Sequence, residues 1–230
     1  MESIPNFTDR VNPARRPERS PENMVYYLKN GVLACFKGKT YMKTATVNGQ
    51  TISAEAVNFE FDRLVKFYVS HGMTNDEVKK NVLKLQEKAL EQAIGAKLLL
   101  ERASQVELPV SAKDVDAEVA RVVDQIGGEE NFEKALAAQG ITEETLRREI
   151  EKGVRVNMLV TQACAHVADP TEDEVAAFYE ANKAEYAAIK QTLVDVHDQI
   201  KDLLRHEARG KAMDAFVAEL REKASIEYHG

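Results

Sequence analysis

The sequence contains no tryptophan and only two cysteines among its 230 residues. Cys35 lies in an irregular N-terminal stretch and Cys164 lies inside a helical pattern, which argues against a structural disulfide between them. No segment approaches the ~18 consecutive apolar residues of a membrane-spanning helix, so we expect no membrane insertion. A chain of this length can bury a core without a disulfide or a metal.

Proline and charge are unevenly distributed. Four of the six prolines lie in the first 23 residues, and residues 1–45 carry eight Lys or Arg against four Asp or Glu. We therefore expect residues 1–45 to be a disordered or weakly ordered basic extension, with Met42 as an alternative native start. The remainder carries a net charge of −11, which repels phosphate and argues against a nucleic-acid partner. Since no signal sequence with a cleavage pattern is evident, we expect a cytoplasmic location.

Motifs for catalysis or metal binding are also lacking. The five histidines do not have the spacing of a metal-binding helix, and the two cysteines do not form a zinc-binding pair. There is no glycine-flanked nucleophile and no phosphate-binding glycine loop. Paired carboxylates occur at helix starts, where the helix dipole accounts for them. We expect no catalytic residues, no metal and no cofactor, and hence no enzyme.

Helical patterns occupy most of the remaining chain. Capping signals begin the helices, apolar residues recur at three- and four-residue spacing, and glycines such as Gly72 and Gly140 end them. Because the helices differ in length and no repeat or heptad seam is present, the pattern predicts an all-α fold, an irregular helical bundle. The predicted helices cover about residues 54–71, 74–104, 111–126, 129–139, 142–167, 171–186 and 194–224.

A small β element precedes the first helix. Asn48-Gly49 lies between two short β-prone runs in residues 45–53, which predicts a hairpin with a tight turn. A second β-prone run, Ser225 to Tyr228, follows the last helix and is predicted to pair with this hairpin.

The order of these elements resembles the SurA/PrsA-type parvulin peptidyl-prolyl isomerase family. The resemblance rests on Val47 to Ser53 (Val-Asn-Gly-x-x-Ile-Ser), on Ala89 to Leu99, and on Pro170 to Asn182 (Pro-Thr-Glu-x-Glu-Val-x-x-Phe-Tyr-x-x-Asn). In the family the last of these runs leads into the catalytic parvulin domain of roughly ninety residues. Here only Ala187 to Leu193 separate Tyr186 from Val194, so the resemblance implies a chain without that domain.

The resemblance implies a SurA N-terminal-type fold, with residues 46–230 as a helical chaperone domain whose core is completed by the last helix, 194–224. It also implies an ATP-independent, chaperone-like module that binds unfolded or partly folded polypeptides without prolyl isomerase activity. A homodimer is compatible with the sequence. Relatives that act outside the cytoplasm make a periplasmic or extracytoplasmic location the alternative to the cytoplasmic one.

A holder of non-native chains needs dispersed apolar side chains within a polar rim. Five residues lie near helix ends or off the main apolar stripes and are candidates for peptide binding, with ordinary core packing as the alternative for each: Phe59, Phe67, Tyr68, Met73 and Phe132. Two other functions stay open. One is a helical adaptor or assembly protein with one dedicated folded partner, and the other is an enzyme of unrecognised type.

Overall fold

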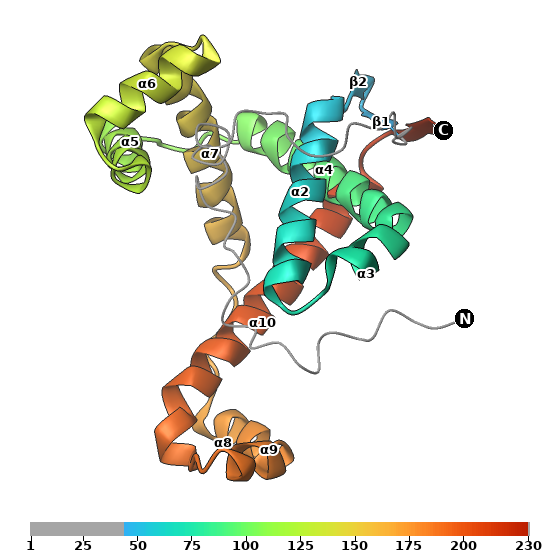
Figure 1. The fold of residues 1–230 in the computed structure, drawn as a ribbon, viewed down its shortest axis with the longest axis vertical. Coiled ribbons are helices and arrows are strands. Elements are labelled where there is room, and N and C mark those ends of the chain that lie inside the picture. Colours follow the sequence, from blue (N-terminus) through green and yellow to red (C-terminus); the bar gives the residue numbers. More distant parts are fainter. Residues whose placement is uncertain (1–43, 230) are drawn as a thin grey trace. The chain divides into compact units, whose positions relative to one another are not determined.

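The computed structural model describes residues 44–229 (Figure 1), so residues 1–43 of the predicted basic extension, Met42 among them, lie outside the described residues. The last two residues of that extension, Thr44 and Ala45, are instead part of a β-strand, and Ala45 is 0% exposed. The described part is mainly helical with one small sheet, which confirms the predicted fold class. It divides into two compact units: a larger unit of residues 44–160 and 217–229, and a smaller unit of residues 161–216. Among the described helices, none is long and apolar enough to cross a membrane.

The sheet of the larger unit joins segments from opposite ends of the described chain. Its order is β2 (Gln50–Thr51), β1 (Thr44–Val47) and β3 (Ile226–His229), with both pairings antiparallel. Asn48 and Gly49 both have positive φ, 51° and 78°, which suits the tight turn of a hairpin. The predicted hairpin and the predicted pairing of the C-terminal strand are both confirmed.

The first helices of the larger unit begin at the predicted caps. α2 (Ala54–Ser70) is capped by Ser53, whose side chain accepts a hydrogen bond from the N–H of Ala56. Thr74 and Glu77 form the predicted capping box of α3 (Asn75–Lys80). The prediction of one continuous helix over 74–104 was wrong, because the chain breaks at Asn81 before α4 (Val82–Gln105). The Asn81 amide donates to the Glu77 carbonyl oxygen at 2.8 Å, a local bond of the kind that competes with helix continuation.

The first core lies between β1, α2 and α4 and is completed by residues near the C-terminal end of the unit. Val57, Phe61 and Leu64, which follow one another at four- and three-residue spacing on α2, are buried against α4. α10 (Leu193–Glu222) ends in this unit, where Leu220 and Ile226 pack against the same core. Helix α4 contributes most of the other fully enclosed side chains: Leu85, Ala89, Leu90, Ala93, Ile94 and Leu98.

Three further helices of the larger unit form a second core. α5 (Ala112–Ile126) ends at Gly127 with φ 94°, and α6 (Glu129–Gln139) ends at Gly140 with φ 66°, as the glycine pattern predicts. α7 (Glu143–Ala163) ends four residues before the predicted boundary. Its face and those of α5 and α6 bury a common set of apolar side chains: Val119, Val122, Phe132, Leu136, Leu146, Ile150 and Val154.

The smaller unit is built from α8 (Glu172–Ala181), α9 (Lys183–Ala188) and the first part of α10. Val175 of α8 packs with Val196 and Ile200 of α10, and each is 1% exposed or less. The family resemblance implies that the last helix, 194–224, completes the core of the domain. In the structure, Val196 and Ile200 in the first half of α10 pack against α8, whereas Leu220 near its end packs against the first core.

Candidate binding surface

The C-terminal end of α2 carries an aromatic group formed by Phe67, Tyr68 and His71. The rings of Phe67 and Tyr68 meet edge to face with centroids 5.4 Å apart, and the rings of Phe67 and His71 lie 4.2 Å apart. The Lys88 ammonium of α4 donates to the Tyr68 hydroxyl at 3.0 Å and lies 5.6 Å from the ring centroid. All three rings are half-buried, so part of each ring faces solvent. We call this group the α2 aromatic surface.

Met73 follows directly after this surface. Gly72 takes a φ of 95°, which turns the chain so that the Met73 N–H donates to the Tyr68 carbonyl oxygen at 2.9 Å. The Met73 side chain is half-buried against the first core. Two apolar residues nearby in the sequence are exposed: Val69 is 42% exposed and Leu83 is 70% exposed.

The remaining two residues predicted from the sequence lie elsewhere. Phe59 is half-buried on α2, two turns before the α2 aromatic surface. Phe132 is only 1% exposed and lies inside the second core with Val122 and Leu146. The surface position expected for Phe132 is therefore corrected: it is a core residue, and we leave it out of the candidate surface.

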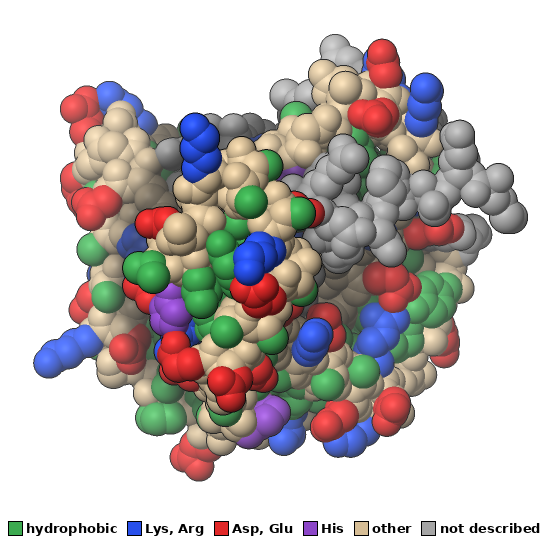
Figure 2. All heavy atoms as spheres, turned by 90° about the horizontal axis from the view of Figure 1, so that it is seen from below, with side chains coloured by type: hydrophobic (Ala, Val, Ile, Leu, Met, Phe, Trp, Pro, Cys, Tyr) green, Lys and Arg blue, Asp and Glu red, His purple; other side chains and the backbone are tan. Residues whose placement is uncertain are grey.

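Apolar side chains on the molecular surface are dispersed among charged ones. Figure 2 shows one face on which small groups of apolar side chains alternate with Lys, Arg, Asp and Glu. In the smaller unit, Ile189 and Val194 flank the turn between α9 and α10 and are 63% and 87% exposed. The rings of Tyr179 and Tyr186 stack with centroids 5.3 Å apart, and the Tyr179 hydroxyl donates a hydrogen bond to the carbonyl of Gln191 in that turn.

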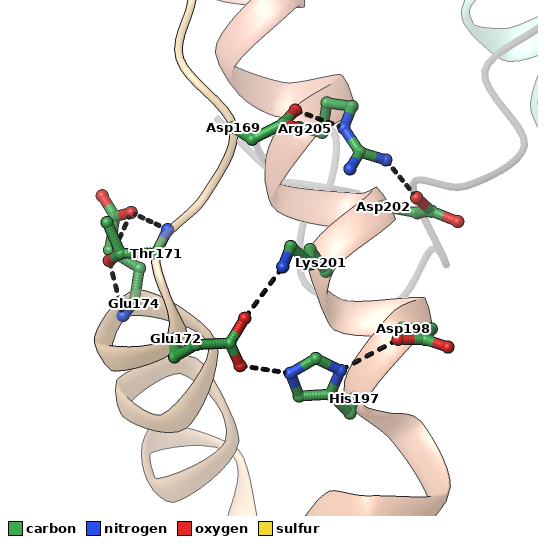
Figure 3. Close-up of polar contacts among 9 residues, drawn as sticks. All are labelled: Asp169, Thr171, Glu172, Glu174, His197, Asp198, Lys201, Asp202 and Arg205. Atoms are coloured by element: carbon green, nitrogen blue, oxygen red, sulfur yellow. Dashed lines mark hydrogen bonds and ion pairs between the residues drawn. The ribbon is translucent and has the colours of Figure 1, made fainter.

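A polar cluster joins the start of α8 to α10 (Figure 3). Glu172 accepts from the Lys201 ammonium at 2.8 Å and lies 2.6 Å from His197 Nε2. The other ring nitrogen of His197 lies 2.9 Å from Asp198. A histidine with a carboxylate at each nitrogen donates at both only when it is protonated. The geometry thus favours the imidazolium form.

The electrostatics of this cluster follow from the same contacts. Lys201 and then His197 lower the pKa of the Glu172 carboxyl from 4.5 to about 2. Asp198 and then Glu172 raise the pKa of His197 above its ordinary 6.5. One helical turn further on, Arg205 donates to Asp169 at 2.7 Å and lowers the pKa of that carboxyl. These contacts hold the residues at the start of α8 against α10. The cluster contains no nucleophile.

Sequence reasoning did not identify this polar cluster. One signal was present, because His197, Lys201 and Arg205 follow one another at four-residue spacing and so share one face of α10. Two of the acidic partners, Asp169 and Glu172, lie at the boundary before α8 and in its first turn, and Asp198 lies on α10 itself. Cys164, also in the smaller unit, is half-buried, with its Sγ 3.8 Å from the Arg209 carbonyl oxygen.

Comparison with known proteins gives a family match over most of the larger unit. The matching family model is the SurA-like N-terminal domain, and it covers residues 25–160. Two proteins named foldase protein PrsA, from two strains of Clostridium perfringens, are each 24% identical to the chain over 159 residues. The aligned part is 66% of this chain and 46% of each relative, so the chain spans about half the length of these curated relatives. No solved structure matches significantly.

Proposed function

Because the chain belongs to the family of SurA-like N-terminal domains, we propose that it is a chaperone-like module that binds non-native polypeptide and delays its aggregation without ATP. The observation that carries the proposal is the family match over residues 25–160. The relatives named foldase support a role in protein folding. The clients would be unfolded or partly folded chains, recognised by their exposed apolar side chains.

The character of the surface supports this proposal. Phe67, Tyr68 and Met73 offer half-buried aromatic and thioether groups, and Leu83 is a largely exposed aliphatic side chain. Met and aromatic side chains adapt to partners of different shape. Charged residues between the apolar groups keep any single apolar patch small, which limits self-association. We propose that Phe59 contributes to the same binding activity from the preceding turns of α2.

An aggregation assay tests the proposal. A chemically unfolded client is diluted into buffer with the purified chain at near-stoichiometric ratio and without ATP, and light scattering is followed. We expect delayed aggregation for several unrelated clients. The double variant Val69→Gln, Leu83→Gln should protect less well, while Lys84→Gln, an exposed change in the same turn as Leu83, serves as the matched control. Unchanged scattering for every client would refute the proposal, and protection of one client alone would favour the dedicated adaptor.

We further propose that the chain does not catalyse prolyl isomerisation. The resemblance places the catalytic domain after α8 and α9, where this chain has a turn between Ala188 and Leu193. Seven residues, 187–193, are too few to form a domain with its own core.

The location of the protein is a separate proposal. We expect the cytoplasm, with an extracytoplasmic site as the alternative. Fractionation of cells that express the full chain decides between them.

A further inference from the structure

The outer edge of β3 has backbone groups that no strand of the described chain pairs with. β3 is the last strand in the order β2-β1-β3, and its four residues pair with β1 only. The register places Val47 opposite Ile226, Thr46 opposite Glu227, Ala45 opposite Tyr228 and Thr44 opposite His229. An edge of this kind is a template for a further strand.

Two hydrogen bonds identify which residues of β3 face outward. The Asn48 N–H donates to the Ser225 carbonyl at 2.8 Å, so Ser225 faces β1. In an antiparallel pair every second residue faces the partner, so Glu227 and His229 also face β1. The Ile52 N–H bonds the Ala45 carbonyl at 2.9 Å, which agrees with this alternation because Ala45 faces β2. The N–H and C=O groups of Ile226 and Tyr228 therefore point away from the sheet.

Side-chain contacts hold this edge in place. Ile226 packs against the first core. The Tyr228 hydroxyl donates to Glu91 of α4 at 3.0 Å and accepts from Arg221 of α10 at 3.0 Å. Burial, with the bond to Glu91 as a second cause, raises the pKa of Tyr228. The strand is thus anchored on one face, and neither proline nor a bulge blocks its outer edge within residues 226–229.

We propose that the outer edge of β3 binds an extended segment of a non-native polypeptide as a fourth strand of the sheet. The inference rests on the proposed function, and it names the contact by which the protein recognises a client. Four backbone groups, two donors and two acceptors, specify an extended main chain and require no particular side chains. Recognition through the backbone suits a protein whose clients differ in sequence.

A second copy of the chain fits this edge less well. An antiparallel pair of two β3 strands that uses all four outward groups sets Ile226 of one copy opposite Tyr228 of the other. Glu227 of one copy then lies directly opposite Glu227 of the other, in a closely spaced pair. Like charges at such a position are destabilising. A client segment carries no such fixed charge, so the client is the occupant that we assign.

Amide hydrogen exchange of the full chain tests the contact directly. In the free protein, the amides of Ile226 and Tyr228 should exchange quickly, while those of Glu227 and His229 should be protected by β1. The probe is a ten-residue peptide of alternating valine and threonine with lysine at each end. At saturating peptide, exchange at Ile226 and Tyr228 should slow by about tenfold or more. Unchanged exchange at both amides would overturn the proposal.

A pair of variants isolates the outward N–H group. Tyr228→Pro removes this N–H and the side-chain bonds to Glu91 and Arg221, whereas Tyr228→Ala removes only the side-chain bonds. Binding of the fluorescein-labelled peptide, measured by anisotropy, should be about two- to tenfold weaker for Tyr228→Pro than for Tyr228→Ala, the equivalent of one hydrogen bond. Thermal unfolding verifies that both variants fold. Equal affinities of the two folded variants would contradict strand addition.

Two further outcomes separate this inference from the proposed function. If the chain delays client aggregation but Ile226 and Tyr228 stay unprotected, the edge proposal fails and the chaperone proposal stands. If the peptide protects both amides but no client is kept from aggregating, strand addition stands and the chaperone proposal fails. Protection of these amides that rises with protein concentration in the absence of peptide identifies a second copy as the occupant and overturns the assignment to a client.

Discussion

Asn48 and Ser225 exchange two hydrogen bonds although 177 positions separate them in the chain. The Asn48 N–H donates to the Ser225 carbonyl at 2.8 Å, and the Ser225 N–H donates to Asn48 Oδ1 at 3.0 Å. The Asn48 amide also donates to Glu101 at 2.7 Å. One turn residue thus connects the hairpin, the end of α4 and the segment that enters β3.

Substitution of Asn48 should separate its backbone role from its side-chain role. Asn48→Gly keeps the positive φ and loses the side-chain bonds, and we expect the free energy of unfolding to fall by about 1 kcal/mol. Asn48→Ala loses the same bonds and must also place a Cβ at positive φ, so we expect a fall of about 2–3 kcal/mol. Urea unfolding measures both. Equal losses for the two variants would show that the turn conformation contributes nothing.

Gly95 of α4 should tolerate one methyl group but no more. A Cβ at Gly95 would lie 3.4 Å from Val217 Cγ1, an ordinary contact, and alanine favours a helix over glycine by about 1 kcal/mol. Gly95→Ala should therefore raise the free energy of unfolding by up to about 1 kcal/mol, and Gly95→Leu should lower it by about 1–3 kcal/mol.

Gly153 of α7 is the matched control for Gly95, because its Cβ would meet nothing within 4 Å. Thermal and urea unfolding should show a gain for Gly153→Ala and little loss for Gly153→Leu. A tolerated Gly95→Leu would contradict close packing of α10 on α4.

We propose that the last residues are required for the first core, as expected for a domain over 46–230. A chain ending at Phe216 loses β3 and the partly buried Leu220 and Ile226, and uncovers Ala45 and Val47, which are 0% exposed. Each apolar side chain of this size stabilises by up to roughly 1.5–3 kcal/mol, a large share of a net stability of about 5–15 kcal/mol. The shortened chain should lose its cooperative thermal transition in circular dichroism. An unchanged transition would show that residues 217–229 are an appendage.

The contact between α8 and α10 should be most stable between about pH 4.5 and 6.5. Glu172 has a pKa of about 2 in the folded chain against 4.5 ordinarily, so its contribution is present above pH 4.5 and is lost as the pH falls toward 2. His197 has a raised pKa, so its contribution is present below pH 6.5 and is lost as the pH rises through the raised value. NMR titration of the His197 ring should give a pKa above 6.5.

Variants of this cluster check the assignment. Asp198→Asn and Glu172→Gln should each lower the His197 pKa, with the larger change for Asp198, the stronger of the two causes. Asp173→Asn removes an acidic charge from the same turn as Glu172 and is the control. A His197 pKa that stays the same in both cluster variants would contradict the geometry of Figure 3.

The chain should not accelerate prolyl cis–trans isomerisation. The uncatalysed barrier of ~18–20 kcal/mol leaves a slow background against which catalysis is easily measured. A proline-containing peptide assay should give the same rate with and without the chain, with a mock purification as the control. A rate that rises in proportion to the concentration of the chain would refute this prediction.

Sequence reasoning succeeded where one residue type determines the local backbone. Asn48-Gly49 identified the hairpin turn, Thr74 and Ser111 identified helix starts, and Gly140 identified a helix end. The family resemblance, based on the order of these elements, is confirmed by the match to the SurA-like N-terminal domain. These features are encoded within a few residues, so a single sequence is enough to find them.

Features that depend on partners distant in sequence were harder to predict. Apolar periodicity predicted a helix over 194–224 but not that Val175 of α8 covers its Val196 and Ile200. Phe132 was off the main stripes, yet α5 and α7 enclose it. The chain breaks at Asn81, where the Glu77 carbonyl accepts bonds from both the side-chain amide and the backbone N–H of Asn81. The α8–α10 polar cluster could not be predicted from the sequence, because it forms only when α8 and α10 lie side by side.

The pairing of β1 with β3 also fixes an order of events during synthesis. Val47 pairs with Ile226, so β3 is synthesised roughly 180 residues after β1. At about 5–20 residues per second, the interval between the synthesis of β1 and that of β3 is roughly 10–40 s. Ala45 and Val47, fully covered in the finished fold, lack that cover throughout this interval. A nascent chain of this protein is therefore itself an incompletely folded polypeptide until its last segment has emerged.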